Sequence, residues 1–130
     1  MSSLNVMVVD DSEITVRKIT KILEDIGHKV IASCPSGKEV EQTYRRVNPD
    51  IVTMDITMPD IDGIEATRIL VRQFPDVKIV MVTSHGQEQM VMEAISAGAL
   101  GYVLKPIKPE KLKNTIEKVV ASQRGLPNDG

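Results

Sequence analysis

Short apolar runs alternate with longer stretches in which apolar residues recur every three or four positions. Each run is too short for a helix and is rich in β-branched residues, which is typical of a buried strand. The five runs are residues 6–9, 30–32, 51–54, 79–82 and 102–104. The pattern therefore predicts five strands, each followed by a helix.

Helix boundary signals support the same division. Ser12 is a candidate N-cap, and after it Ile14, Ile19, Ile22, Leu23 and Ile26 recur at helical spacing until Gly27. The other predicted helices begin near Ser36, Gly63, Gln87 and Pro109, and they end near Asn48, Phe74, Gly98 and Ser122.

The connections between the predicted strands are too long for hairpins and have the length of crossovers. Such a chain favours a parallel sheet with helices on both faces. The fold class is therefore α/β, and no internal repeat or linker interrupts residues 1–124. The tail, residues 125–130, is rich in Gly, Pro and Asn and is expected to be loose.

The stretch DIVTMDITMPDIDG, residues 50–63, is the most informative. A buried strand ends there in an acid, Asp55, and Pro59 soon prevents the strand from continuing. In open α/β sheets, ligands bind at the carboxyl ends of strands, so Asp55 could hold a metal, act as a base or attack an electrophile. An ordinary N-cap or loop acid is an equally good interpretation of this stretch alone.

The other strands also end in reactive side chains. Asp10 and Asp11 follow the first strand, Thr83 ends the fourth and Lys105 follows the fifth. Because the ends of parallel strands share one edge, three carboxylates, a hydroxyl and an ammonium should meet there. Crowded acids need a cation, and oxygen ligands suit Mg²⁺. A carboxylate beside Mg²⁺ can be a nucleophile, and a phosphoryl group is the electrophile that Mg²⁺ and Lys105 could neutralise.

Other kinds of site do not fit the residues. A calcium-binding EF-hand loop counted from Gly63 would begin at Met58 and close at Ile69, neither of which is an acid. Thr57 stands where aspartyl phosphatases have a second acid. There is no phosphate-binding glycine loop after the first strand, and His28 and His85 lack partners at zinc spacing.

Composition and net charge narrow the range of binding partners and locations that we expect for the protein. The 130 residues carry a formal net charge of −2, which gives no electrostatic reason to expect direct binding of nucleic acid. The single cysteine, Cys34, cannot form an internal disulfide, and no apolar run approaches the length of a membrane span. We expect a cytoplasmic protein, monomeric, without membrane contact.

The ordered set Asp10-Asp11, Asp55 with Met58-Pro59 and Gly63, Thr83-Ser84 and Lys105-Pro106 resembles the receiver domain of two-component response regulators, from about Asn5 to about Ser122. The resemblance implies a flavodoxin-like fold with strand order 2-1-3-4-5. It also implies that Asp55 accepts a phosphoryl group from a histidine kinase, and that the chain catalyses only its own phosphotransfer and dephosphorylation.

The resemblance assigns further roles. Asp11, Asp55 and the backbone carbonyl of Thr57 would hold Mg²⁺, with Asp10 joining directly or through water. Lys105 would pair with the phosphoryl group, and the Lys105-Pro106 bond would be cis. Thr83 would turn onto the phosphoryl group and Tyr102 would follow it inward. The helix over 87–97, the strand over 102–104 and the helix over 110–122 would form the responding face, with Val91, Ile95, Tyr102 and Ile107 near it.

Two outputs remain open. The stretch 86–91 and Tyr102 are similar to single-domain chemotaxis regulators, whose partners are a chemotaxis kinase and a flagellar motor switch protein. The alternative is the receiver part of a longer transcriptional regulator. Thr57 and His85 depart from common chemotaxis members at two places that face the attacking water in the family, so the dephosphorylation rate does not carry over. Ile107 also replaces the Phe that is common after the Lys-Pro pair.

Overall fold

The computed structural model describes residues 3–122, in which strands and helices alternate as predicted. The strands are β1 (Asn5–Val9), β2 (Lys29–Cys34), β3 (Ile51–Met54), β4 (Ile79–Thr83) and β5 (Gly101–Leu104). The helices are α1 (Glu13–Asp25), α2 (Val40–Val47), α3 (Gly63–Gln73), α4 (Glu88–Ala97) and α5 (Pro109–Ser122), and a short 3-10 turn, η1 (Gly37–Glu39), precedes α2. The predicted loose tail lies outside the described residues.

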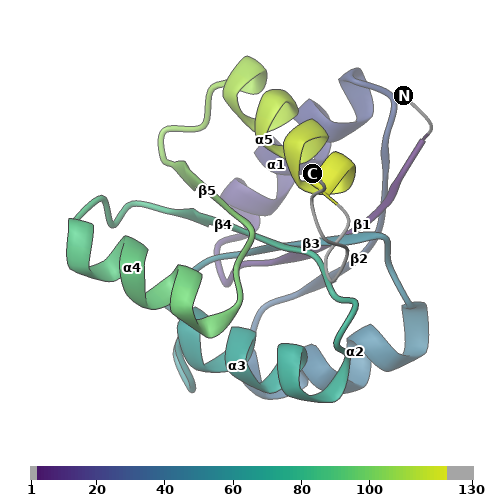
Figure 1. Ribbon diagram of the computed structural model, residues 1–130. Helices are drawn as coiled ribbons and strands as arrows, with labels where there is room; N and C mark the ends of the chain where they lie inside the picture. The colour runs from purple at the N-terminus through teal and green to yellow at the C-terminus, as the bar shows by residue number, and fades with distance from the viewer. Residues whose placement is uncertain (1–2, 123–130) are drawn as a thin grey trace.

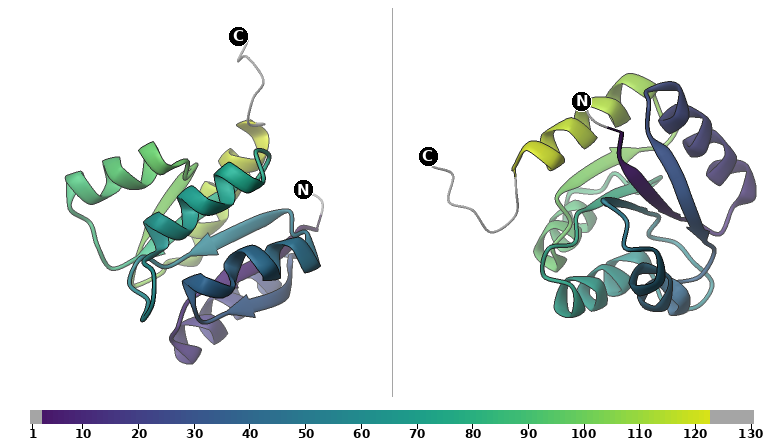
Figure 2. Two further views of the ribbon diagram at one scale, coloured as in Figure 1. Left: turned by 90° about the horizontal axis from the view of Figure 1, so that it is seen from below. Right: turned by 90° about the vertical axis from the view of Figure 1, so that its right-hand side faces the viewer.

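All four strand pairs are parallel, and the order across the sheet is β2-β1-β3-β4-β5, which confirms the predicted order. Helices α1 and α5 cover one face of the sheet, and α2, α3 and α4 cover the other (Figure 1). Figure 2 shows the same two layers from other directions. No helix within residues 3–122 has the length and apolar character needed to cross a bilayer.

The apolar side chains form one cluster on each face of the sheet. Met7, Met54 and Met81 pack with α2, α3 and α4, whereas Val8, Ile51 and Val80 pack with α1 and α5. The central strand β3 is buried along its whole length, as expected for a strand covered on both faces. This burial holds the carboxyl end of β3 firmly, which is where Asp55 lies.

The register of the sheet aligns the strand ends. Val9 of β1 pairs with Met54 of β3, and Thr83 of β4 pairs with Leu104 of β5. The hydrogen bonds between β1 and β3 continue one residue past the end of β3, because the amide of Asp55 donates to the carbonyl of Val9 at 2.9 Å. The acids that follow β1 and β3 therefore leave the sheet side by side.

Side-chain caps fix where the helices after β1 and β3 begin. The hydroxyl of Ser12 accepts the Thr15 amide at 3.3 Å to cap α1, and the carboxylate of Asp62 accepts the Glu65 amide at 2.9 Å to cap α3. A Cβ on Gly63 would lie 2.0 Å from the carbonyl oxygen of Asp55, so the chain can return this closely only through glycine.

Two apolar residues lie elsewhere than the pattern suggests. Ile14 has helical spacing with the buried residues of α1, but it lies at the start of the helix, beyond the sheet, and is 78% exposed. Ile107 is expected, as an apolar residue after β5, near the responding face. It is instead 5% exposed and packs in the cluster under α1 and α5, because the chain turns inward between β5 and α5.

Candidate functional site

Three carboxylates meet at the carboxyl edge of the sheet. Asp10, Asp11 and Asp55 can each offer one oxygen such that the three atoms lie within 4.8 Å of one another. Asp10 and Asp55 are only 3% and 7% exposed, whereas Asp11 is open to solvent. The strand ends therefore bring together the three acids that the sequence singled out.

Lys105 supplies a positive charge at the same place. Its ammonium nitrogen lies 3.0 Å from Asp10 Oδ2 and 3.5 Å from Asp55 Oδ1. The side chain reaches inward from the loop after β5, where the Lys105-Pro106 peptide bond is cis, as the resemblance implied. One ammonium beside three carboxylates leaves the site with an excess of negative charge.

This excess has a direct effect on Asp55. Burial raises the pKa of its carboxyl, and the neighbouring Asp10 raises that pKa further, while the charge of Lys105 opposes both. The ionised form of Asp55 is thus disfavoured until a cation arrives. Oxygen-only donors gathered this closely fit Mg²⁺, which takes carboxylate, carbonyl and water ligands. Thr57 lies in the adjoining loop, with its side chain exposed.

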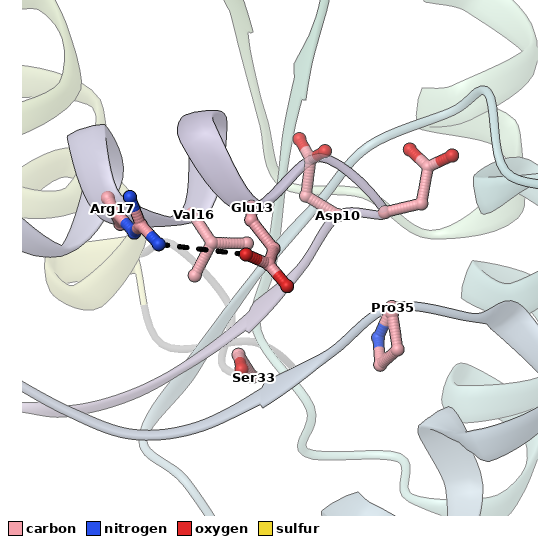
Figure 3. Close-up of a pocket in the computed structure, with 7 residues that line it drawn as sticks. Asp10, Glu13, Val16, Arg17, Ser33 and Pro35 are labelled. Atoms are coloured by element: carbon pink, nitrogen blue, oxygen red, sulfur yellow. Dashed lines mark ion pairs between the residues drawn. The ribbon is translucent and has the colours of Figure 1, made fainter.

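A small hollow opens beside the acids (Figure 3). It measures about 300 Å³ and lies between the start of α1 and the end of β2, where Ser33 and Pro35 form its far side. Glu13 and Arg17 pair with each other across its rim at 3.6 Å. A small group could therefore approach the carboxylates from this side.

Thr83, the predicted switch residue, is completely buried at the end of β4. Its hydroxyl oxygen accepts the main-chain amide of His85 at 3.2 Å. Tyr102 of β5 is partly buried, and its hydroxyl donates to the main-chain carbonyl of His85 at 2.6 Å. The two predicted switch residues are thus linked through one residue of the β4–α4 loop.

Beside Tyr102, a second hollow lies between α4, β5 and the start of α5, lined by Val91, Tyr102, Leu104, Lys105, Pro106, Lys108 and Lys111. Leu104, which lines this hollow, is 48% exposed, and Ile95 of α4 is 49% exposed. Met92 of α4 is 61% exposed but lines a separate hollow with Arg68 of α3. The predicted responding face therefore carries an apolar surface beside several lysines.

Two features of the site are not predicted by the sequence. Thr57 Oγ1 and His85 Nε2 form a hydrogen bond of 2.8 Å between the loops that follow β3 and β4. The carboxylate of Asp60 accepts the hydroxyl of Ser36 at 2.6 Å and the amides of Lys38 and Gly37 at 2.8 and 3.0 Å. Both contacts join loops far apart in the sequence, and no local motif indicates such contacts.

Comparison with known proteins shows the family to which this fold belongs. The family model described as response regulator receiver domain matches residues 6–117 of this chain. The chain belongs to the response regulator receiver family.

Known receivers of different kinds are similar to this one. Chemotaxis protein CheY of Thermotoga maritima is 37% identical, over 88% of this chain and 95% of that protein. Response regulator UvrY of Escherichia coli K12 is 39% identical over 97% of this chain, which spans 58% of the length of that regulator. A chain in the crystal structure of the CheX-CheY-BeF3-Mg complex from Borrelia burgdorferi has a TM-score of 0.87 and 32% identity, with coverage of 91% and 90%.

Proposed function

We propose that this receiver accepts a phosphoryl group on Asp55 from a histidine kinase, with Mg²⁺ held by Asp10, Asp11, Asp55 and the backbone carbonyl of Thr57. The observation that carries the proposal is the cluster of three carboxylates with the Lys105 ammonium at 3.0 and 3.5 Å from two of them. The similar Borrelia structure is that of a complex with both Mg and BeF3, which supports the same site for this chain.

The proposed reaction is a direct transfer. An oxygen of the Asp55 carboxylate attacks the phosphorus of a phosphohistidine, so that an O–P bond forms while the N–P bond breaks. The electron pair of the broken bond remains on the imidazole nitrogen of the kinase. The Lys105 ammonium offsets charge on the phosphoryl oxygens, and Mg²⁺ supplies further neutralisation when bound. Hydrolysis of the acyl phosphate by water returns the free carboxylate.

The signal would leave the site through Thr83 and Tyr102. The hydroxyl of Thr83, at the end of the strand next to β3, is a neutral donor that can swing toward new phosphoryl oxygens, and it would have to release the His85 amide to do so. Tyr102 is held to the carbonyl of that same residue, so its environment would change as well. The affected face would be α4, β5 and α5, where Val91 and Ile95 lie.

For the output we propose chemotaxis, with a chemotaxis kinase upstream and a flagellar motor switch protein downstream. The support is the similarity to CheY of Thermotoga maritima over 95% of that protein. The second candidate is a receiver that governs transcription through a separate output domain, which the similarity to UvrY favours. In both cases the phosphoryl group derives from ATP, so we propose the cytoplasm as the place of action.

Two experiments test the proposal. Acetyl phosphate with Mg²⁺ should add one base-labile phosphoryl group, observed by intact-protein mass spectrometry, and Asp55→Asn should not be labelled. Labelling that persists in Asp55→Asn would show that the acceptor is another residue.

A pull-down with beryllofluoride-loaded protein should then retain a flagellar switch protein rather than a DNA-binding partner, with Asp55→Asn as the control.

A further inference from the structure

His85 makes hydrogen bonds in three directions. Its main-chain amide donates to Thr83 Oγ1 at 3.2 Å, its carbonyl accepts the hydroxyl of Tyr102 at 2.6 Å, and its ring nitrogen Nε2 lies 2.8 Å from Thr57 Oγ1. Within residues 3–122, no other residue is hydrogen-bonded to all three of these side chains. One residue of the β4–α4 loop therefore contacts the loop after β3, the end of β4 and β5.

The contact with Thr57 differs from the other two in its origin. The contacts with Thr83 and Tyr102 use the main chain of His85 and would persist with any side chain at this position. The contact with Thr57 uses the imidazole ring and would not. It joins the β3–α3 loop to the β4–α4 loop. The side chain of His85 thus adds a connection that the backbone fold does not supply.

We propose that His85 is a positioning residue that couples the occupancy of the metal site to Tyr102 through its hydrogen bond with Thr57. This inference rests on the proposed function, in which the Thr57 carbonyl is a ligand of Mg²⁺. A cation that binds the carbonyl oxygen of Thr57 shifts this residue, and its hydroxyl shifts with it. The imidazole ring follows the hydroxyl, and the His85 carbonyl, on which Tyr102 is anchored, moves with it.

This route does not pass through the Thr83 hydroxyl. Thr83 responds to a phosphoryl group on Asp55, whereas the bridge from Thr57 to His85 responds to the position of the β3–α3 loop. The cation alone should therefore begin to reposition the surroundings of Tyr102 before any phosphoryl group arrives. Coupling of this kind can be measured as the change around Tyr102 when a cation binds the acidic site.

The test is a titration with Mg²⁺ alone, followed by the amide chemical shifts of the whole protein. In the wild type, the amides of Asp11 and Asp55 should shift with the same midpoint as those of Tyr102 and Leu104. His85→Phe keeps a ring but removes its nitrogens. It should reduce the shifts at Tyr102 and Leu104 by about twofold or more, while those at Asp11 and Asp55 persist.

Two matched variants make the result specific to the hydrogen bond. His85→Gln places an amide nitrogen near the position of Nε2 and should preserve the shifts at Tyr102. Thr57→Val should weaken those shifts when His85 is present, and should weaken them no further when combined with His85→Phe. This non-additivity is the signature of one shared contact, which a general loosening of the loop would not produce.

The outcomes separate this inference from the proposed function. A full response at Tyr102 in His85→Phe, with normal shifts at Asp55, would overturn the coupling and leave the metal site intact. Equal losses in His85→Phe and His85→Gln would overturn it as well, because the ring nitrogen would then not matter. A wild-type protein in which Mg²⁺ shifts neither Asp11 nor Asp55 would overturn the metal site and the coupling together.

Discussion

The ammonium nitrogen of Lys105 lies 3.0 Å from a carboxylate oxygen of Asp10, a residue 95 positions earlier in the chain. Asp10 is almost fully buried, and the same ammonium is 3.5 Å from Asp55. Without a metal, the single charge of Lys105 must therefore neutralise two buried carboxylates. The site holds more negative charge than its own lysine can compensate, so its stability should depend on pH and on cations.

Replacement of Asp55 by Asn should stabilise the metal-free protein. The pKa of Asp55 is raised in the fold, so the folded state keeps its proton at a pH where the unfolded state has lost it. Stability is therefore lost as pH rises from the unfolded pKa of about 3.9 through the folded pKa. In Asp55→Asn this loss should vanish, so the variant should be more stable than the wild type at pH 7.

Urea unfolding with a chelator, repeated from pH 4 to pH 7, measures this difference. The exposed acid Glu24 of α1 offers a control, since Glu24→Gln removes a charge far from the site. If Asp55→Asn and wild type lose stability in parallel over this range, the crowding of acids does not govern it.

Mg²⁺ should raise the thermal stability of the wild type. A ligand that binds only the folded state adds about 2.7 kcal/mol at a hundred times its dissociation constant. Asp11→Ala removes the exposed member of the cluster and should abolish the gain while leaving the metal-free melting temperature close to that of the wild type. Differential scanning calorimetry with and without millimolar Mg²⁺ gives the answer, and an unchanged wild-type curve would contradict a shared metal site.

Two buried threonines should respond oppositely to replacement by valine. The hydroxyl of Thr53 is buried without a hydrogen-bond partner among residues 3–122, whereas that of Thr67 donates to the Gly63 carbonyl at 2.7 Å. Thr53→Val should raise the free energy of unfolding by about 1 kcal/mol, and Thr67→Val should lower it by about the same amount. Chemical denaturation of both variants measures the pair. A loss of stability in Thr53→Val would reveal a partner for its hydroxyl.

Asp60 should stabilise the protein only where it is ionised. The hydrogen bond from Ser36, with those from the neighbouring amides, holds the pKa of Asp60 well below its usual range. Its contribution is therefore present above the unfolded pKa of about 3.9 and is lost as pH falls toward the folded pKa. Asp60→Asn should be less stable than the wild type at pH 7, and the difference should shrink below pH 4.

Ser36→Ala offers a graded comparison for Asp60. It removes the hydroxyl contact with Asp60 and the 3.2 Å bond from the Lys38 amide to Ser36 Oγ, but leaves both amide contacts of Asp60. The pH-dependent part of its loss should therefore be smaller than that of Asp60→Asn. A difference between wild type and Asp60→Asn that stays constant down to pH 2 would show that the charge of Asp60 is not what holds the two loops together.

Much of the fold follows from local patterns. The bounds of β3 agree with the short run that predicts it, because a strand covered on both faces has no solvent-facing position and is buried throughout. The edge strand β2 extends to Lys29–Cys34, well beyond its apolar run, because its ends alternate between core and solvent. Ile14 is exposed although its spacing matches that of the buried residues of α1, because spacing alone does not tell whether a residue at the end of a helix still faces the core. Ile107 is buried, whereas we expect it near the responding face from its position after β5.

The acids and Lys105 could be predicted because each directly follows a strand, and parallel strands end at one edge. The contacts of Thr57 with His85 and of Asp60 with Ser36 could not, because they join loops whose paths depend on the packing of whole helices. Sequence reasoning thus located the chemical groups of the site, whereas the connections among its loops required the structure.

The register of β1 against β3 and of β4 against β5 also has a consequence for the synthesis of the chain. Asp10 and Asp55 become neighbours only after the long-range pair of β1 and β3 has closed, and Lys105 joins them only when β5 has docked on β4. A nascent chain on the ribosome therefore carries its acids long before it can use them. A truncated product that lacks β5 would therefore not be phosphorylated, and it would not consume phosphoryl groups from the kinase.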